Sequence, residues 1–199
     1  MNTNKKKIIG ITGGVGAGKS SVLSVLKDCF GARVILADLV AHDLMEPGME
    51  GLKRVTDALG TSFLNGDGSV DRKALAELIF NNEAALSTMN SIIHPMVWET
   101  IQREATDCEE SLVIVEAAVF DTAPSGLFDE MWYVYTSKEN RIRRLMESRG
   151  YTAEKCESII SKQDSEEMYR SRCNRVIDNN GSEEDTRVQI EEILGHEIC

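Results

Sequence analysis

Residues 13–20 have the sequence Gly-Gly-Val-Gly-Ala-Gly-Lys-Ser, which fits the pattern G-x-x-x-x-G-K-[ST]. Glycines allow backbone N–H groups to wrap closely around a phosphate, and a helix that starts directly after the loop favours an anion. Lys19 can reach the β- and γ-phosphates of a nucleotide, and the Ser20 hydroxyl can bind Mg²⁺. A glycine-rich turn without chemistry is the alternative, but an apolar strand pattern precedes this loop and an amphipathic helix pattern follows it. The segment therefore predicts a phosphate-binding loop.

A single carboxylate, Asp38, follows the second apolar run of the chain, Val34–Leu36. Parallel strands end at the same edge of a sheet, and ligands of open α/β sheets bind outside these ends. A carboxylate there can accept the proton of an attacking hydroxyl, orient that hydroxyl or hold metal-bound water. The alternative is that Asp38 is only the N-cap of the next helix, and capping does not exclude catalysis.

Several other side chains have both a functional and a structural interpretation. Glu116 and Asp121 follow the apolar run Leu112–Val115, where an acidic residue can be associated with a metal or simply be solvated. His94 precedes Pro95 in an apolar helical pattern, where a structural role is the default and a ligand contact the alternative. Four arginines share a helical pattern further along: Arg141, Arg143, Arg144 and Arg149. Arginine stabilises a phosphoryl group in transfer, but four on one helix cannot all point inward, so we expect one or two to be functional.

The elements that must position these residues alternate between strand and helix patterns, which predicts a parallel sheet. The expected strands are Ile8–Ile11, Val34–Leu36, Leu112–Val115, Trp132–Tyr135 and Val176–Ile177. Gly31 is expected to cap the helix after the phosphate-binding loop, and Asp71 to cap a helix over Ala74–Phe80. His94-Pro95 is expected to interrupt a long amphipathic stretch that ends near Ala105.

Two connections are longer than a parallel sheet requires. Roughly seventy residues separate the second and third expected strands, whereas a crossover needs about a dozen. The second long connection contains the segment from Lys138 to Arg175, where ten basic and seven acidic residues give a net charge of +3. We interpret both as insertions into one α/β core.

The composition limits the class of protein. The chain has 199 residues, 42% of them hydrophobic, with 33 acidic and 22 basic side chains and a net charge of −11. This favours a globular core over extended disorder, and the acidic balance disfavours non-specific binding to nucleic acid. The five cysteines include no C-x-x-C pair, and the apolar segment after Lys5-Lys6-Lys7 is far too short for a signal peptide or a membrane span. We expect a cytoplasmic protein with neither a nucleic-acid nor a membrane partner.

In their order along the chain, the motifs resemble those of the dephospho-coenzyme A kinase family, almost from end to end. The segments that carry the resemblance are Ile11–Ser20, Ala37–His42, Glu46–Gly48, His94-Pro95 and Val176–Gly181. The chain also departs from the family pattern. Leu36 stands where the family has an additional Asp, so only Asp38 can carry the carboxylate role. Ala117–Asp121 replaces a Pro-Leu-Leu-Phe-Glu segment, and Ser148 stands where many members carry Arg, with Arg149 one position later.

The resemblance implies a fold and a reaction. The fold is α/β: a P-loop NTPase kinase core with a five-stranded parallel sheet, a helical acceptor-binding insertion and a helical lid. The core would comprise residues 1–41, 107–137 and 173–199, the acceptor domain residues 42–106 and the lid residues 138–172. The implied reaction is transfer of the ATP γ-phosphate, with Mg²⁺, to the ribose 3′-hydroxyl of dephospho-coenzyme A, the last step of coenzyme A synthesis. A monomer or a small homo-oligomer is expected.

The resemblance also implies roles for individual residues. The expected catalytic residues are Lys19, Asp38, Arg144 and Arg149. The expected ATP-binding residues are Gly14, Val15, Gly16, Ala17, Gly18, Lys19, Ser20, Ser21 and Asn179. The expected acceptor-binding residues are Thr12, Asp38, His42, His94 and Glu116, and Ser20 is the expected Mg²⁺ ligand.

Two other classes of protein share some of these features. Another small-molecule kinase would share the loop, the insertion and the lid, but not the Asn-Asn-Gly segment or the His-Pro pair. A GTPase switch would need an Asn-Lys-x-Asp motif to bind its base, and the only Asn-Lys pair is Asn4-Lys5, ahead of the first expected strand. These differences favour the first interpretation.

Overall fold

The computed structural model describes residues 6–195, so Asn4-Lys5 and Cys199 lie outside the described residues. The chain divides into two compact units. The first, which we call the sheet unit, comprises Met1–Ile35, Cys108–Phe120 and Ser125–Cys199; the second, the helical unit, comprises Leu36–Asp107 and Asp121–Pro124. Within the described part of the chain, no helix has both the length and the apolar character needed to cross a membrane.

A five-stranded parallel sheet forms the centre of the fold, in the strand order β2-β3-β1-β4-β5. The strands are β1 (Lys7–Thr12), β2 (Arg33–Leu36), β3 (Leu112–Glu116), β4 (Glu130–Tyr135) and β5 (Arg175–Asp178). The central strand β1 pairs in parallel with β3 and β4, and β4 pairs in parallel with β5. The predicted five-stranded parallel α/β fold is therefore confirmed.

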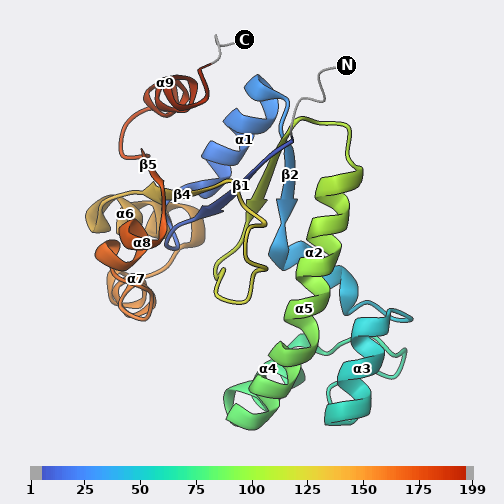
Figure 1. Cartoon of the computed structure of the whole chain (residues 1–199). Coiled ribbons are helices and arrows are strands. Elements are labelled where there is room, and N and C mark those ends of the chain that lie inside the picture. The colour runs from blue at the N-terminus through green and yellow to red at the C-terminus, as the bar shows by residue number, and fades with distance from the viewer. Residues whose placement is uncertain (1–5, 196–199) are drawn as a thin grey trace. The chain divides into compact units, whose positions relative to one another are not determined.

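The described residues of the sheet unit form five helices, which Figure 1 labels. They are α1 (Lys19–Phe30), α6 (Lys138–Arg149), α7 (Ala153–Ile160), α8 (Glu166–Arg172) and α9 (Glu183–Leu194). Helices α1 and α9 pack with the sheet in one hydrophobic cluster that contains Leu26, Trp132, Val134 and Ile190. Side chains alternate along a strand, so Tyr133 lies on the opposite face of β4, where α8 packs and Tyr169 stacks on its ring.

The helical unit contains four helices, α2 (Ala37–Leu44), α3 (Glu50–Leu59), α4 (Arg72–Phe80) and α5 (Glu83–Asp107). The expected interruption at His94-Pro95 is wrong, because α5 continues through Pro95 as one helix of 25 residues. Proline removes one backbone donor, but α2, α3 and α4 all pack along α5, whose side chains Ile93 and Val97 are buried. Tertiary packing therefore preserves the helix.

Of the helix caps considered from the sequence, two are present in the structure and one is not. Gly31 ends α1 in the left-handed conformation with φ of 62°, and the Asp71 side chain accepts hydrogen bonds from the first turn of α4, as predicted. The alternative interpretation of Asp38 as the N-cap of the next helix is wrong. Helix α2 starts at Ala37, directly after β2, so its N-cap is Leu36 and Asp38 lies within the first turn. A negative charge there still interacts favourably with the helix dipole.

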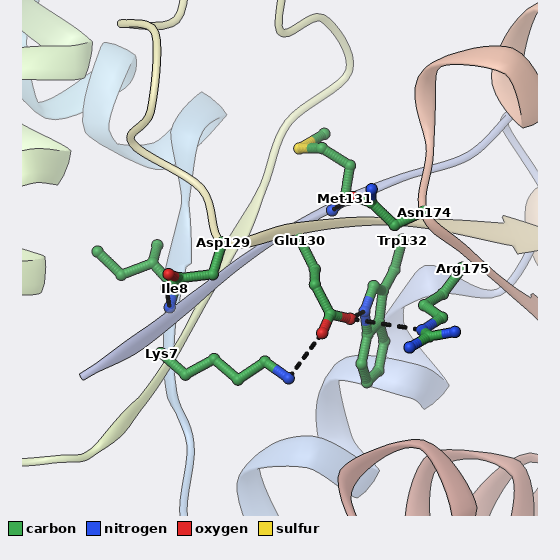
Figure 2. A network of polar contacts seen from close by, with 8 residues as sticks. All are labelled: Lys7, Ile8, Asp129, Glu130, Met131, Trp132, Asn174 and Arg175. Atoms are coloured by element: carbon green, nitrogen blue, oxygen red, sulfur yellow. Dashed lines mark hydrogen bonds and ion pairs between the residues drawn. The ribbon is translucent and has the colours of Figure 1, made fainter. Parts of the chain in front are cut away.

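A network of polar contacts joins β1, β4 and β5 at their amino ends (Figure 2). The Glu130 carboxylate lies 2.8 Å from Lys7 Nζ and 3.7 Å from Arg175 Nε, and it accepts a 2.8 Å hydrogen bond from the indole of Trp132. Partial burial opposes its ionisation, but the hydrogen bonds from Lys7 and Trp132 and the two positive charges lower the pKa of Glu130 overall. The network holds the amino ends of three strands together.

Candidate active site

The phosphate-binding loop, residues 13–18, connects the carboxyl end of β1 to α1. Gly16 and Gly18 have φ of 77° and 79°, a conformation that residues with a Cβ rarely adopt. Gly18 is also the N-cap of α1, and a Cβ there would collide with the side-chain amide of Asn179. These positions therefore require glycine for conformation as well as for space.

Side chains hold several backbone carbonyls of this loop. Lys19 Nζ donates to the carbonyl of Gly13 at 2.8 Å, and Arg141 Nε donates to the carbonyl of Val15 at 2.8 Å. In a planar trans peptide, the C=O and the following N–H point in opposite directions. The N–H groups of Gly14 and Gly16 therefore point away from these donors, as a loop that binds an anion requires.

The carbonyl of Ala17 is held from three segments of the chain. The Asn179 side-chain amide donates to it at 2.8 Å, the Thr136 hydroxyl lies 2.9 Å away and Arg144 Nη1 lies 3.3 Å away. Arg144 also donates to the backbone carbonyl of Asn179 at 2.7 Å. By the same peptide geometry, these contacts direct the N–H of Gly18 away from the scaffold.

Asn179 is buried, and both ends of its side-chain amide are bonded within the protein. Its nitrogen donates to the loop, and its oxygen accepts a 2.8 Å hydrogen bond from the buried hydroxyl of Thr186. Asn179 therefore helps to fix the shape of the loop.

Lys19 and Glu116 face one another across the sheet unit. Lys19 begins α1, Glu116 ends β3, and Nζ lies 3.4 Å from the Glu116 carboxylate. Both side chains are largely shielded from water, with 20% and 16% exposure. Glu116, an expected acceptor-binding residue, thus lies beside the lysine expected to bind phosphate.

The arginines of α6 have different environments. Arg144 is half-buried and reaches the carbonyls described above, whereas Arg149 is exposed at the last position of the helix. Arg141 is only 9% exposed; it is one of the four candidate arginines but not one of the expected catalytic residues. The signal that could have identified it is its helical spacing to Leu145, which is buried one turn later.

Within the helical unit, Asp38 and His42 line a groove of about 470 Å³. Both residues belong to α2, and Arg72 from α4 lines the same groove. Arg72 Nη2 lies 2.9 Å from His42 Nε2, and Glu46 approaches the same nitrogen at 3.3 Å. Asp38 is exposed to solvent in this groove.

His94 has a contact that fits the structural alternative. Its Nδ1 lies 3.2 Å from the hydroxyl of Thr122, which also accepts a 3.0 Å hydrogen bond from the indole of Trp98. The contacts fasten the segment Asp121–Pro124 to α5 within the helical unit.

The expected site residues are thus divided between the two units. The sheet unit contains the buried Thr12, the loop Gly14–Gly18, Lys19, Ser20 and Ser21 at the start of α1, Glu116, Arg144, Arg149 and Asn179; the helical unit contains Asp38, His42 and His94. The structure brings the loop, Lys19, Glu116, Arg144 and Asn179 together in the first unit, and Asp38 and His42 together in the second.

Comparisons with known proteins give one consistent result. A family model described as dephospho-CoA kinase matches residues 7–185. A dephospho-CoA kinase from Carboxydothermus hydrogenoformans is 36% identical over 191 residues, which cover 94% of this chain and 92% of that protein. A crystal structure from Thermus thermophilus matches with a TM-score of 0.79 at 32% identity, covering 96% of this chain and 97% of that one. A dephospho-CoA kinase structure from Campylobacter jejuni, at 23% identity, a TM-score of 0.62 and 96% coverage of both chains, supports the fold alone.

Proposed function

The chain belongs to the dephospho-CoA kinase family, and from this premise we propose that it transfers the γ-phosphoryl group of ATP to the ribose 3′-hydroxyl of dephospho-coenzyme A. The observation that carries the proposal is the loop of residues 13–18, whose carbonyls are held by Lys19, Arg141, Arg144 and Asn179. A loop prepared in this way binds polyphosphate without having to reorganise its dipoles during the reaction.

Lys19 and the loop amides bind the phosphates of ATP in this proposal. The ammonium group of Lys19 lies 2.8 Å from a neutral carbonyl and 3.4 Å from Glu116, so it is already held at the loop. As negative charge develops on the transferring oxygens, this fixed positive charge stabilises the transition state more than the ground state. Glu116 positions the ammonium group.

Ser20 is the proposed protein ligand of Mg²⁺. Its hydroxyl is a hard oxygen donor, and it lies exposed in the first turn of α1 beside Lys19. Mg²⁺ usually binds through substrate phosphates, waters and few protein oxygens, which one hydroxyl fits. When bound, the ion would neutralise charge on the phosphates.

Asp38 is the proposed acceptor-side residue. Its carboxylate is exposed in the groove of the helical unit and does not cap α2, so it is available to an acceptor hydroxyl. There it orients the 3′-hydroxyl and accepts its proton as the new bond to phosphorus forms. In this proposal, the acceptor is also bound by His42, His94 and Thr12.

The remaining proposals concern the lid, the location and the assembly. We take residues 138–172 as the lid and residues 42–106 as the acceptor domain, with Arg144 as the lid arginine that contacts the phosphates and Arg149 as a second candidate. A cytoplasmic location agrees with the lack of a C-x-x-C pair in the sequence, and a monomer is the simplest assembly.

A coupled assay for ADP release tests the function, with ATP as donor and dephospho-coenzyme A, AMP and shikimate as separate acceptors. We expect the highest kcat/KM with dephospho-coenzyme A, and phosphorus NMR of the product to show a new 3′-phosphomonoester. Asp38→Asn keeps the size of the side chain but removes its charge, so it should bind ATP normally and transfer phosphate about 10²- to 10⁴-fold more slowly. A preference for another acceptor would contradict the proposal, and normal transfer by the variant would exclude Asp38 from the reaction.

A further inference from the structure

One side-chain oxygen contacts the phosphate-binding loop from the segment between α7 and α8. Gln163 Oε1 accepts a 3.0 Å hydrogen bond from the backbone N–H of Val15 and a 2.5 Å hydrogen bond from Arg141 Nη2. The same guanidinium uses its Nε to hold the carbonyl of Val15 at 2.8 Å. An amide oxygen thus occupies a position where a loop N–H and a guanidinium donate together.

This pair of donors is well suited to a more negative acceptor. A backbone N–H and a guanidinium that converge on one oxygen form the kind of site that binds phosphate, and charge-assisted hydrogen bonds are about twice as strong as neutral ones. We propose that Val15 N–H and Arg141 form the binding site for an oxygen of the transferring phosphoryl group, and that Gln163 occupies this site until the phosphoryl oxygen displaces it. Arg141 is then a catalytic residue, and Gln163 a competitor for the phosphate.

The environment of Arg141 makes this charge effective. The side chain is 9% exposed, and burial lowers the pKa of its guanidinium, which nevertheless remains protonated at neutral pH. It donates hydrogen bonds to neutral oxygens of Val15 and Gln163. A positive charge that is removed from water and held by neutral groups interacts strongly with an incoming anion.

The guanidinium is also close enough to the loop to touch a bound phosphate. A Cβ added to Gly14 would collide with the guanidinium group of Arg141, so arginine nitrogens lie directly against the loop backbone. Arg141 belongs to α6. One turn further along this helix, Leu145 packs against Gly16 of the same loop. The helix therefore holds the guanidinium in place.

Gln163 has room to leave. It lies between the end of α7 at Ile160 and the start of α8 at Glu166, so its movement does not require a helix to break. A cavity of about 320 Å³, lined by Tyr133, Arg141 and Gln163 among others, adjoins the contact. A change of rotamer can therefore transfer the amide into this space.

The first test uses ligand affinity and needs no acceptor. Gln163→Ala removes the competitor and should bind a non-hydrolysable ATP analogue, with an imido bridge between its β- and γ-phosphates, about 3- to 10-fold more tightly. Gln163→Glu offers Arg141 a charged competitor and should bind the same analogue at least about 10-fold more weakly. The Kd of ADP, which lacks the γ-phosphate, should change less than about twofold in either variant. Weaker analogue binding by both variants, or equal effects on ADP and the analogue, would overturn the proposal.

The second test concerns Arg141 directly, and Arg143→Ala is its matched control. Arg143 carries the same charge on the same helix but is exposed, so its replacement should leave kcat within about twofold. Arg141→Ala should lower kcat by about 10³-fold, and Arg141→Lys, which keeps the charge and most of the packing, by less. Arg141→Ala and Arg141→Lys should both lose tight binding of ADP with aluminium fluoride, which mimics the phosphoryl group in transfer. If Arg141→Lys is folded, as judged by thermal unfolding, and binds this mimic as the wild type does, Arg141 is structural.

This inference rests on the proposed function for ATP as the phosphoryl donor and does not depend on the identity of the acceptor. Failure of the wild-type protein to phosphorylate dephospho-coenzyme A would contradict the proposed function, whereas the affinities of the Gln163 variants for the ATP analogue and ADP would still decide the inference.

Discussion

Cationic side chains at the two ends of the sheet are contacted by different groups. At the amino ends of the strands, Lys7 and Arg175 lie against one carboxylate, Glu130 (Figure 2). At the carboxyl ends, Arg141 and Arg144 are held by carbonyl, amide and hydroxyl oxygens. An arginine held by neutral oxygens keeps more of its charge for a ligand than a cation in direct contact with a carboxylate. Lys19 is intermediate, because it donates to the Gly13 carbonyl at 2.8 Å and lies 3.4 Å from the Glu116 carboxylate. The contacts at the amino ends therefore stabilise the sheet, whereas those at the carboxyl ends are suited to binding an anion.

Lys19 should show the largest effect. Lys19→Ala removes an ammonium group that is held at the loop, so turnover should fall by about 10³-fold or more, while the melting temperature changes little. Steady-state kinetics and thermal unfolding measure the two quantities. A variant that keeps more than a tenth of the wild-type turnover would show that the charge at this end is not used in transfer.

Arg144 should come next, because it holds the loop through the Ala17 carbonyl as well as carrying charge. We expect Arg144→Ala to lower kcat by about 10²-fold, in the range seen when one preorganised donor is lost. Arg149→Ala, at the exposed end of α6, is the comparison variant, and we expect a smaller loss of turnover. A larger loss from Arg149→Ala would transfer the role of phosphate contact from Arg144 to Arg149.

Glu130 should affect stability and leave catalysis intact. Glu130→Gln removes the charge that joins the three strands, so we expect the free energy of unfolding to fall by about 1–2 kcal/mol at pH 7. The folded-state pKa of this carboxyl is below its ordinary value of 4.5, so its contribution is present above pH 4.5 and is lost as the pH falls through the folded-state pKa. Urea unfolding at several pH values should show wild type and variant converging in acid. A constant difference down to the acid limit would contradict the assigned charge effect.

Arg175 should give the smallest effect. Its guanidinium is about half exposed and lies 3.7 Å from Glu130, so the ion pair is screened by water. Arg175→Gln should change the free energy of unfolding by less than about 0.5 kcal/mol. A loss similar to that of Glu130→Gln would mean that Arg175, more than Lys7, anchors the amino-end network.

Features that depend on nearby residues could be predicted from the sequence. The loop Gly13–Ser20 and the caps Gly31 and Asp71 follow from local backbone chemistry, and the strands follow from apolar runs bounded by turns. Pro95 misled the prediction, because its local preference is overcome by the packing of helices from elsewhere in the chain. The capping alternative for Asp38 fails for another reason, because α2 begins directly after β2 and places Asp38 within its first turn.

The contact between Gln163 and the loop was beyond prediction for a different reason. Gln163 and Val15 are far apart in sequence, and a single glutamine has no pattern that separates it from solvated neighbours. Arg141 could be recognised only as one of several arginines, since its burial depends on how α6 packs against the loop. Counting charges located the basic segment, but only the structure shows which of its arginines contact the loop.

The crowding around Gly14 and Gly18 also restricts which sequences the family can adopt. Two features disfavour any other residue at position 18: its positive φ and the nearby side chain of Asn179. A smaller residue at position 179 would therefore not be enough to allow a substitution of Gly18. At Gly14, the atoms nearest to an added Cβ all belong to the guanidinium of Arg141. Residues 14 and 141 should therefore covary among relatives, with alanine or serine at position 14 appearing only where position 141 carries a smaller side chain.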